Sequence, residues 1–250
     1  MSIDYAIHLA EQGEHGRCRE VLAAIVIARH DSVGALLKVG IVYEDIDDFE
    51  SALRCYQRVL ALDESVPRVR GALGRCLCEL GRYDEGIRML AQCADEDPRA
   101  FRLVLLGDAL RNAGREDEAA EAIGRALEAD PADCDARCLM AELLELKDPD
   151  ASAEHCRLSL LDDPGHEGAL FLLAKLRRRA GDLAGSRELL ERGVSLRDTS
   201  YWMVILLAEL CWTQGDLDRA HEMYRRAFEL SPDEKTKQWF DEFRVATGRR

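Results

Sequence analysis

Residues 201–234 read YWMVILLAELCWTQGDLDRAHEMYRRAFELSPDE, and this stretch decides the fold because the rest of the chain repeats its pattern. Residues 100–133, AFRLVLLGDALRNAGREDEAAEAIGRALEADPAD, show the same order of apolar, small, glycine and proline positions. Across the 250 residues a small residue returns every 33 or 34 positions, at Ala6, Gly40, Gly74, Gly107, Ala141, Ala174 and Ala208. A fixed period of this size indicates stacked copies of one supersecondary unit.

Each copy is predicted to form two short helices joined by tight turns. Glycine suits the left-handed residue that ends a helix, and proline begins a helix well but does not fit its interior. Apolar positions three and four apart place one face of each helix against its neighbour. The sequence has no sustained alternation of apolar and polar residues, which would indicate strands.

These columns resemble the tetratricopeptide repeat family, and the resemblance covers about 94% of the chain, residues 1–234. The last copy carries the family pattern almost complete, with Leu207, Ala208, Gly215, Ala220, Tyr224, Ala227 and Pro232. The resemblance implies an all-α, right-handed solenoid of seven helix pairs. We expect repeats at 1–32, 33–66, 67–99, 100–133, 134–166, 167–200 and 201–234, and a capping helix and tail at 235–250.

Two repeats depart from the family pattern. The fifth reads LELKDPDAS at 144–152, without the turn glycine, and Pro149 is expected to distort its turn. The sixth has Arg177 where the family prefers tyrosine or another apolar residue. Each departure could be a bend, a contact site or a tolerated irregularity, and the sequence leaves these alternatives open.

The charge balance restricts the classes of partner. A formal net charge of −14 and a pI of about 4.9 argue against a general nucleic-acid binder or a membrane binder, since both need a basic surface. No run approaches the roughly 18 apolar residues of a membrane span, and the first residues lack the pattern of a secretory signal. Nine cysteines, an odd number, favour free thiols in the cytoplasm. Arg outnumbers Lys 29 to 5, which hints at a GC-rich bacterial genome.

The resemblance also implies where a partner binds. In the family, the first helix of each repeat lines a concave groove that receives peptides or helices. Carried over by column, the predicted partner-binding residues are Arg68, Arg75, Phe101, Val104, Asp108, Arg111, Phe171, Lys175, Arg178, Trp202, Ile205, Glu209 and Trp212.

The predicted roles of the apolar and of the basic residues each have an alternative interpretation. The apolar anchors are expected at Phe101, Val104, Phe171, Trp202 and Ile205. The alternative is that such side chains pack between adjacent helices and are buried. The basic residues would select a partner's carboxylates; the alternative is that Arg178, with Arg179, only favours the dipole at its helix end.

The sequence gives little support for other chemistry. A zinc site could in principle form from Cys134, Cys138, His155 and Cys156. These positions match ordinary packing columns, so we expect structural thiols and no metal. No nucleophile elbow, phosphate loop or dinucleotide fingerprint occurs in the sequence. We therefore expect no cofactor and no enzymatic activity.

The expected function is that of a non-catalytic scaffold or adaptor, which binds a helix or peptide segment of another protein. The chaperone-binding members of the family hold a C-terminal carboxylate with a Lys/Asn/Arg clamp, and here Leu37 and Ile41 replace the polar pair. Two alternatives remain open. One is a regulatory subunit that holds a partner enzyme or toxin inactive, and the other is a scaffold that assembles with further copies of itself.

Overall fold

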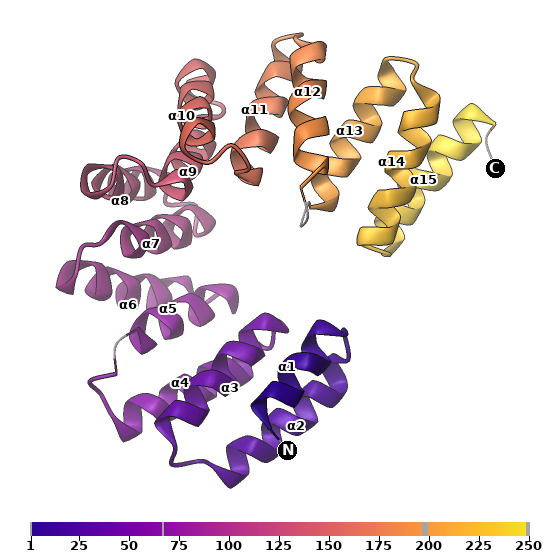
Figure 1. Cartoon of the computed structure of the whole chain (residues 1–250). Helices are drawn as coiled ribbons and strands as arrows, with labels where there is room; N and C mark the ends of the chain where they lie inside the picture. The colour runs from indigo at the N-terminus through magenta and orange to yellow at the C-terminus, as the bar shows by residue number, and fades with distance from the viewer. Residues whose placement is uncertain (1, 67, 197–199, 249–250) are drawn as a thin grey trace. The chain divides into compact units, whose positions relative to one another are not determined.

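The chain is helical throughout the residues that its computed structural model describes, 2–66, 68–196 and 200–248 (Figure 1). The predicted all-α fold is confirmed, and these ranges contain no strand. Position 67, where the third repeat is predicted to begin, and tail residues 249–250 lie outside them. The helices are α1 (Ile3–Glu11), α2 (His15–Ala28), α3 (Val33–Asp45), α4 (Phe49–Leu62), α5 (Val69–Glu79), α6 (Tyr83–Glu96), α7 (Ala100–Asn112), α8 (Glu116–Ala129), α9 (Cys134–Leu144), α10 (Pro149–Asp162), α11 (Glu167–Arg179), α12 (Leu183–Val194), α13 (Tyr201–Thr213), α14 (Leu217–Leu230) and α15 (Glu234–Thr247).

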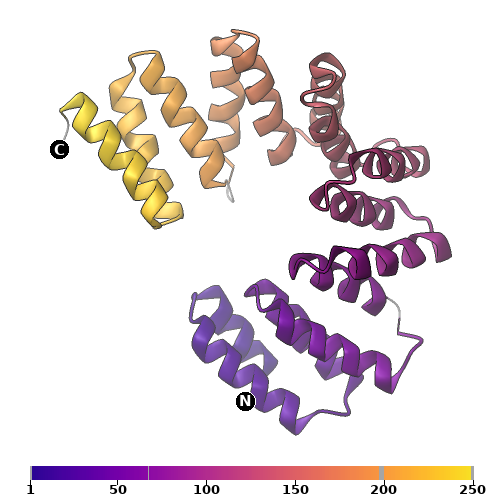
Figure 2. The ribbon, with the colours of Figure 1, turned by 180° about the vertical axis from the view of Figure 1, so that it is seen from behind.

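The helices form two compact units, and each is described by itself. Unit 1, Met1–Pro131, contains α1 to α8, and unit 2, Ala132–Arg250, contains α9 to α15. Within a unit, consecutive helices pack as pairs, such as α3 with α4 and α13 with α14. Figures 1 and 2 show the two helices of a pair side by side from opposite directions. We call the first helix of a pair helix A and the second helix B.

The turn inside most pairs depends on one residue with a left-handed backbone. Asp47 takes this place between α3 and α4 with a φ of 56°, and glycine takes it in five other pairs, at Gly13, Gly81, Gly114, Gly181 and Gly215. The turn between α9 and α10 has no such residue, so the fifth pair departs from the others as the sequence predicts. Pro149 itself fits well, because it is the first residue of α10, where an N–H is not needed.

Small residues at the crossing of helices A and B allow the two backbones to approach closely. A Cβ atom at Gly40 would lie 2.6 Å from the Tyr56 ring, and one at Gly107 would lie 2.5 Å from Ile123. Serine occupies the crossing of α9 and α10, where the buried Ser152 hydroxyl donates a hydrogen bond to the Ala141 carbonyl at 2.7 Å. The repeating small residues therefore exist for packing within the pair.

The last helix covers the end of unit 2. Phe243 of α15 is completely buried, with its ring centroid 5.4 Å from that of Trp212 and 5.1 Å from that of Tyr224. Asp233 and Thr236 form a capping box that fixes where α15 begins. The helix thus acts as the predicted cap of the stack. The division into seven repeats at the stated boundaries stays a prediction.

Candidate functional site

A cleft of about 910 Å³ in unit 1 is the best candidate for a binding site. Three A helices, α3, α5 and α7, supply most of its lining, together with the segments that lead into α5 and α7 and a few residues of α4 and α6. Among the thirteen predicted residues, it brings together Arg68, Arg75 and Phe101. Helix α5 contacts α7, so the outward side chains of these two A helices form one continuous surface.

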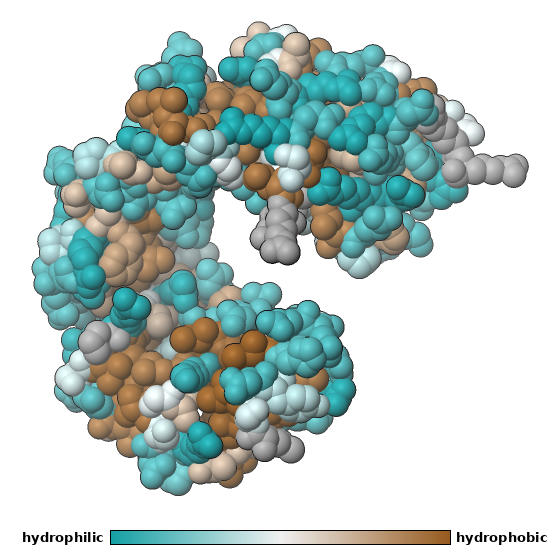
Figure 3. Space-filling model, in the orientation of Figure 1, coloured by the Kyte–Doolittle hydropathy of each residue, from teal (hydrophilic) through white to brown (hydrophobic). Residues whose placement is uncertain are grey.

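Two large apolar side chains reach solvent in this cleft. Ile41 of α3 is 51% exposed and Phe101 at the start of α7 is 43% exposed. Leu37 and Leu105 lie half-buried beside them in the same lining. Figure 3 shows that apolar side chains reach the surface of unit 1 among hydrophilic ones, on the face that it draws over α1 to α4. Exposed side chains of this size, gathered in a hollow, indicate a contact surface for an apolar group.

The carboxylate at the base of the cleft is already neutralised. The guanidinium of Arg75 lies 2.5 Å from the Glu44 carboxylate, and the Cys76 thiol donates to the same carboxylate at 3.1 Å. Burial and the Glu44 charge raise the pKa of Cys76 well above its usual range, so the thiol stays protonated and keeps donating. The Glu44 side chain is only 10% exposed, whereas that of Arg75 is 48% exposed. Arg75 can therefore accept a second partner, and Glu44 cannot.

Arg68 is the cation of the cleft that has no acidic partner. Its neighbours are paired, since Arg70 lies 3.6 Å from Glu96 and Arg102 lies 3.5 Å from Asp97. The Arg68 guanidinium makes no hydrogen bond or ion pair with any residue that the structure describes. Arg68 also has a φ of 75°, in the left-handed region that an arginine rarely adopts. A strained residue that offers a free charge to a cleft is typical of a binding site.

The other predicted residues of unit 1 contribute less. Val104 is half-buried and is not part of the cleft lining. Asp108 and Arg111 pair with each other on α7 at 2.7 Å. Phe101 is flanked by arginines, because the guanidinium of Arg99 lies 5.2 Å from its ring centroid. These contacts hold the Phe101 ring at the mouth of the cleft.

Unit 2 holds the remaining predicted residues, and its basic side chains are already paired. Glu145 accepts two cations, Lys175 at 3.0 Å and Arg179 at 2.8 Å. Arg178 lies 2.9 Å from the predicted residue Glu209. These basic side chains are thus paired with acids of adjacent repeats. The ion pairs hold them in place more firmly than the helix dipole does, which was the alternative for Arg178. A partner's carboxylate would have to compete for them.

The apolar anchors of unit 2 divide into accessible and covered side chains. Trp202 is 43% exposed and lies under the ammonium of Lys235, which is 4.8 Å from its ring centroid. Phe171 is half-buried, and Trp212 packs against the cap helix. The expectation that Ile205 is an accessible anchor is wrong, because Ile205 is 4% exposed within the buried cluster of unit 2. For this residue the alternative of packing between helices holds.

The predicted set of binding residues omits several lining residues of the unit 1 cleft, among them Ile41 and Glu44. Both lie on α3 in the columns of groove-lining positions, so the column that selected Arg75 also contains Ile41. Its exposure was the missing signal, and exposure depends on how α3 sits beside α5.

The structure gives no sign of a metal centre or a membrane span in the part of the chain that it describes. No group of three or more His, Cys, Asp or Glu side chains there could hold a metal ion. Burial lowers the pKa of His155, and Cys156 is completely buried with its pKa raised to about 12. None of the described helices combines the length and the apolar character needed to cross a bilayer.

Comparisons with known proteins agree with this architecture. Two sequence profiles of the tetratricopeptide repeat match the chain, one over residues 47–99 and 79–143 and the other over 203–234. A tetratricopeptide repeat protein from Parabacteroides merdae has a similar structure, with a TM-score of 0.70 and 16% identity over 96% of both chains. No match was found among the curated proteins.

Two further solved structures resemble the chain. Pseudomonas aeruginosa pilF superposes with a TM-score of 0.66 and 18% identity, over 88% of this chain and 99% of that one. A chain of the APC/C hetero-tetramer Cut9-Hcn1 superposes with a TM-score of 0.69 and 14% identity. That match covers 95% of this chain but only 48% of the other, so this chain spans about half its length. The sequence profiles and the helix pairs together show that the chain belongs to the tetratricopeptide repeat family.

Proposed function

We propose that this protein is a non-catalytic scaffold, which binds a helix or an extended segment of another protein in the cleft between α3, α5 and α7. Proteins of this family generally mediate protein–protein interaction, and scaffolds of this kind are generally not enzymes. The observation that carries the proposal is the cleft itself, where exposed Ile41 and Phe101 lie beside the unpartnered cation Arg68. The nine cysteines, all free thiols, agree with a location in the cytoplasm.

The apolar side chains supply the affinity of this docking. A partner's apolar residue that covers Ile41 and Phe101 removes their exposed surface from water, and each anchor of this kind contributes about 1–3 kcal/mol. Phe101 needs little ordering on binding, because Arg99 and Arg102 already flank its ring, 5.2 and 5.7 Å from the centroid. A preordered anchor keeps more of its contact energy.

The arginines select the partner and its register. Arg68 offers a complete guanidinium to a carboxylate, and a paired guanidinium forms two parallel hydrogen bonds. Arg75 is held by Glu44 at 2.5 Å, which fixes its direction while half of its side chain stays exposed. We therefore expect the bound segment to carry an apolar residue, with an acidic residue placed to reach Arg68.

The predicted residues of unit 2 belong to the proposal as a second, weaker contact. Trp202 offers an exposed ring. Lys175 and Arg178 offer charge only by exchanging their present partners, Glu145 and Glu209. Exchange of one carboxylate for another gains little free energy in water. We therefore expect the segment's affinity to depend on unit 1, and the surface of unit 2 is a separate, weaker candidate.

Affinity capture with three matched variants tests this function. The bait is the wild-type chain, a unit 1 variant with Ile41→Glu and Phe101→Ala, or a unit 2 variant with Phe171→Ala, Trp202→Ala and Lys175→Glu. Leu161→Glu serves as the control, because Leu161 is 75% exposed on α10 and lies outside the cleft. We expect a partner that the wild type and the control retain, and that the unit 1 variant loses while circular dichroism shows it folded. Equal retention by every bait would refute the cleft as the site.

A further inference from the structure

The outward face of α2 is apolar over its last two turns, whereas Arg19 and Glu20 are exposed on the turn before them. Ile27 is 77% exposed, and Ala23, Ala24 and Ala28 beside it are also exposed. The residues that α2 gives to the core are others, such as Leu22, which is completely buried. An exposed isoleucine next to exposed alanines marks a part of the helix surface that no described helix covers.

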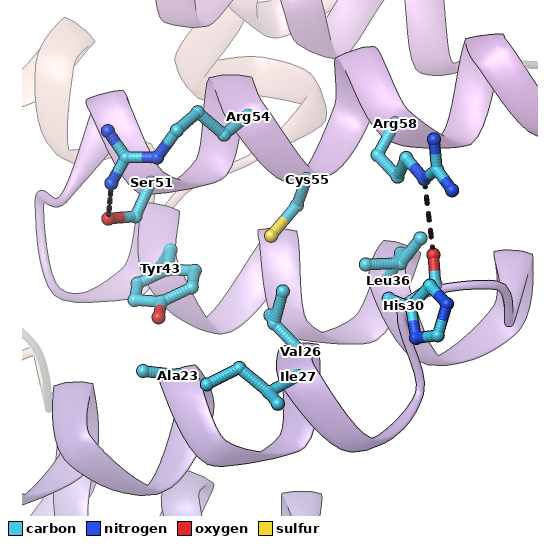
Figure 4. Close-up of a pocket in the computed structure, with 10 residues that line it drawn as sticks. All are labelled: Ala23, Val26, Ile27, His30, Leu36, Tyr43, Ser51, Arg54, Cys55 and Arg58. Carbon is cyan, nitrogen blue, oxygen red and sulfur yellow. Dashed lines mark hydrogen bonds between the residues drawn. The ribbon is translucent and has the colours of Figure 1, made fainter.

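This face forms one wall of a cleft of about 440 Å³ between α2 and α4 (Figure 4). Figure 4 shows the two helices on opposite sides of the cleft, with side chains of α3 between them. Val26 and Ile27 belong to the α2 wall, Arg54 and Arg58 to the α4 wall, and Leu36 and Tyr43 to the floor. This cleft is separate from the one that α3, α5 and α7 form, because the two linings share no residue.

Two arginines on the α4 wall have no acidic partner among the described residues. Arg54 donates to the Ser51 hydroxyl at 2.8 Å, and Arg58 donates to the His30 carbonyl at 3.3 Å. These neutral acceptors use one donor of each guanidinium and leave the positive charge uncompensated. The lining that the structure describes for this cleft contains no acid, and Asp48, directly before α4, is already bound to Arg19 at 3.1 Å.

The floor of the cleft carries one more unused donor. The hydroxyl of Tyr43 makes no hydrogen bond to the described residues, although the tyrosine is 5% exposed. Burial raises the pKa of Tyr43 to about 12, so the hydroxyl stays a neutral donor at physiological pH. An apolar wall, two free guanidinium charges and a hydroxyl thus converge on one hollow.

We propose that the cleft between α2 and α4 is a second docking surface, which takes an acidic amphipathic helix of a partner protein. Arg54 and Arg58 are four residues apart on one helix, so both project from the same face about one turn apart. Carboxylates four residues apart on a partner helix have the same spacing and match them. The apolar stripe of that helix then covers Ile27 and Val26, as in other helix-in-groove complexes.

The charge of the whole chain favours this occupant over a membrane. With a formal net charge of −14, the chain is repelled by anionic lipid, and two arginines do not make a basic surface. An acidic helix meets the same repulsion only weakly, because it carries few charges and salt screens those more than about 8 Å from the acids of the chain. The proposal does not depend on the cleft of α3, α5 and α7, because the two surfaces share no residue named in either argument.

Selection from a displayed library of helical peptides of about four turns, with the full chain as bait, tests the proposal. We expect the enriched peptides to combine an apolar stripe with acidic residues four apart. Their affinity, measured by fluorescence anisotropy of labelled peptide, should fall at least tenfold for Ile27→Glu and for the Arg54→Glu, Arg58→Glu double variant.

Arg88→Glu is the matched control. Arg88 occupies on α6 the repeat column that Arg54 occupies on α4, and its Nε donates only to the Asp84 carbonyl of its own helix. The control should bind the peptides within twofold of wild type, and circular dichroism should show all variants folded. The proposal is overturned by enriched peptides without acidic residues, by affinity that survives Ile27→Glu, by no enrichment, or by light scattering that shows Ile27-dependent self-association instead.

Discussion

A single methyl group at Gly86 tests whether the small residues exist for packing within the helix pair. Gly86 lies on α6, and a Cβ atom there would sit 2.6 Å from the Gly74 carbonyl oxygen of α5 and 3.1 Å from the Cys78 backbone nitrogen. Ordinary contacts begin at 3.4 Å. Helices α5 and α6 would therefore have to separate by roughly 0.8 Å, and backbone cannot yield as a flexible side chain does.

The magnitude follows from two opposing effects. Overpacking of this kind costs about 1–3 kcal/mol, and alanine gains up to about 1 kcal/mol over glycine in a helix interior. With the full propensity gain subtracted, we expect Gly86→Ala to destabilise the chain by up to about 2 kcal/mol. Gly124 on α8 is the control, because a Cβ atom there meets nothing within 4 Å. Gly124→Ala should stabilise the chain by about 0.5–1 kcal/mol.

The assay is urea denaturation followed by circular dichroism, with midpoint and slope compared among wild type and both variants. The account predicts shifts of opposite sign at the two glycines. If Gly86→Ala shifts the midpoint upward as far as Gly124→Ala, the close approach of α5 and α6 does not limit stability, and the packing argument fails.

Three further predictions follow from the described contacts. Arg68→Gly should raise stability by about 1 kcal/mol, because glycine adopts a φ of 75° without strain, and should weaken binding in the unit 1 cleft; a denaturation midpoint at or below that of wild type would contradict the strain. Phe243→Ala should cost about 3–5 kcal/mol and expose Trp212, seen as a red-shifted tryptophan emission, and an unchanged spectrum would argue against the cap. The hydrogen bond from Arg187 holds the pKa of Asp216 below its ordinary 3.8, so the native state gains stability above pH 3.8 and loses it as pH falls below that value. Asp216→Asn should reduce this acid sensitivity in pH-dependent thermal melts, and an unaltered pH profile would count against the Asp216–Arg187 pair.

The fold could be predicted from the sequence because each column of the repeat acts within one helix pair. Gly107 recurs with its neighbours because a Cβ atom there would clash with Ile123, only sixteen residues further along the chain. Gly114 recurs because the turn needs a φ of 75°. Such local requirements repeat with the chain and are visible without coordinates.

The candidate site could be predicted only in part, because it depends on contacts between repeats. Leu37 and Ile205 are each the fifth residue of an A helix, yet Leu37 is half-buried in the cleft lining whereas Ile205 is only 4% exposed. The difference arises from the neighbouring A helices, which the sequence of one repeat does not contain.

Charge pairing is hidden in the same way. Lys175 and Glu145 are thirty residues apart and meet at 3.0 Å. Arg178 and Glu209 are thirty-one residues apart and meet at 2.9 Å. These pairs depend on how adjacent repeats stack and on which rotamers the long side chains adopt. The sequence predicts basic residues in both units, but it does not show that Lys175 and Arg178 are paired while Arg68 has no acidic partner among the described residues.

The most direct test of the central claim is site-specific photo-crosslinking from the cleft. A benzophenone amino acid is placed at position 41, at position 101, or at the control position 161, and crosslinked peptides from lysate are identified by mass spectrometry. The account predicts that positions 41 and 101 capture the same segment of one partner, with an acidic residue near the crosslinked site, and that position 161 does not capture it. Capture of that partner only from position 161, or of unrelated segments from 41 and 101, would contradict the claim that α3, α5 and α7 form its binding site.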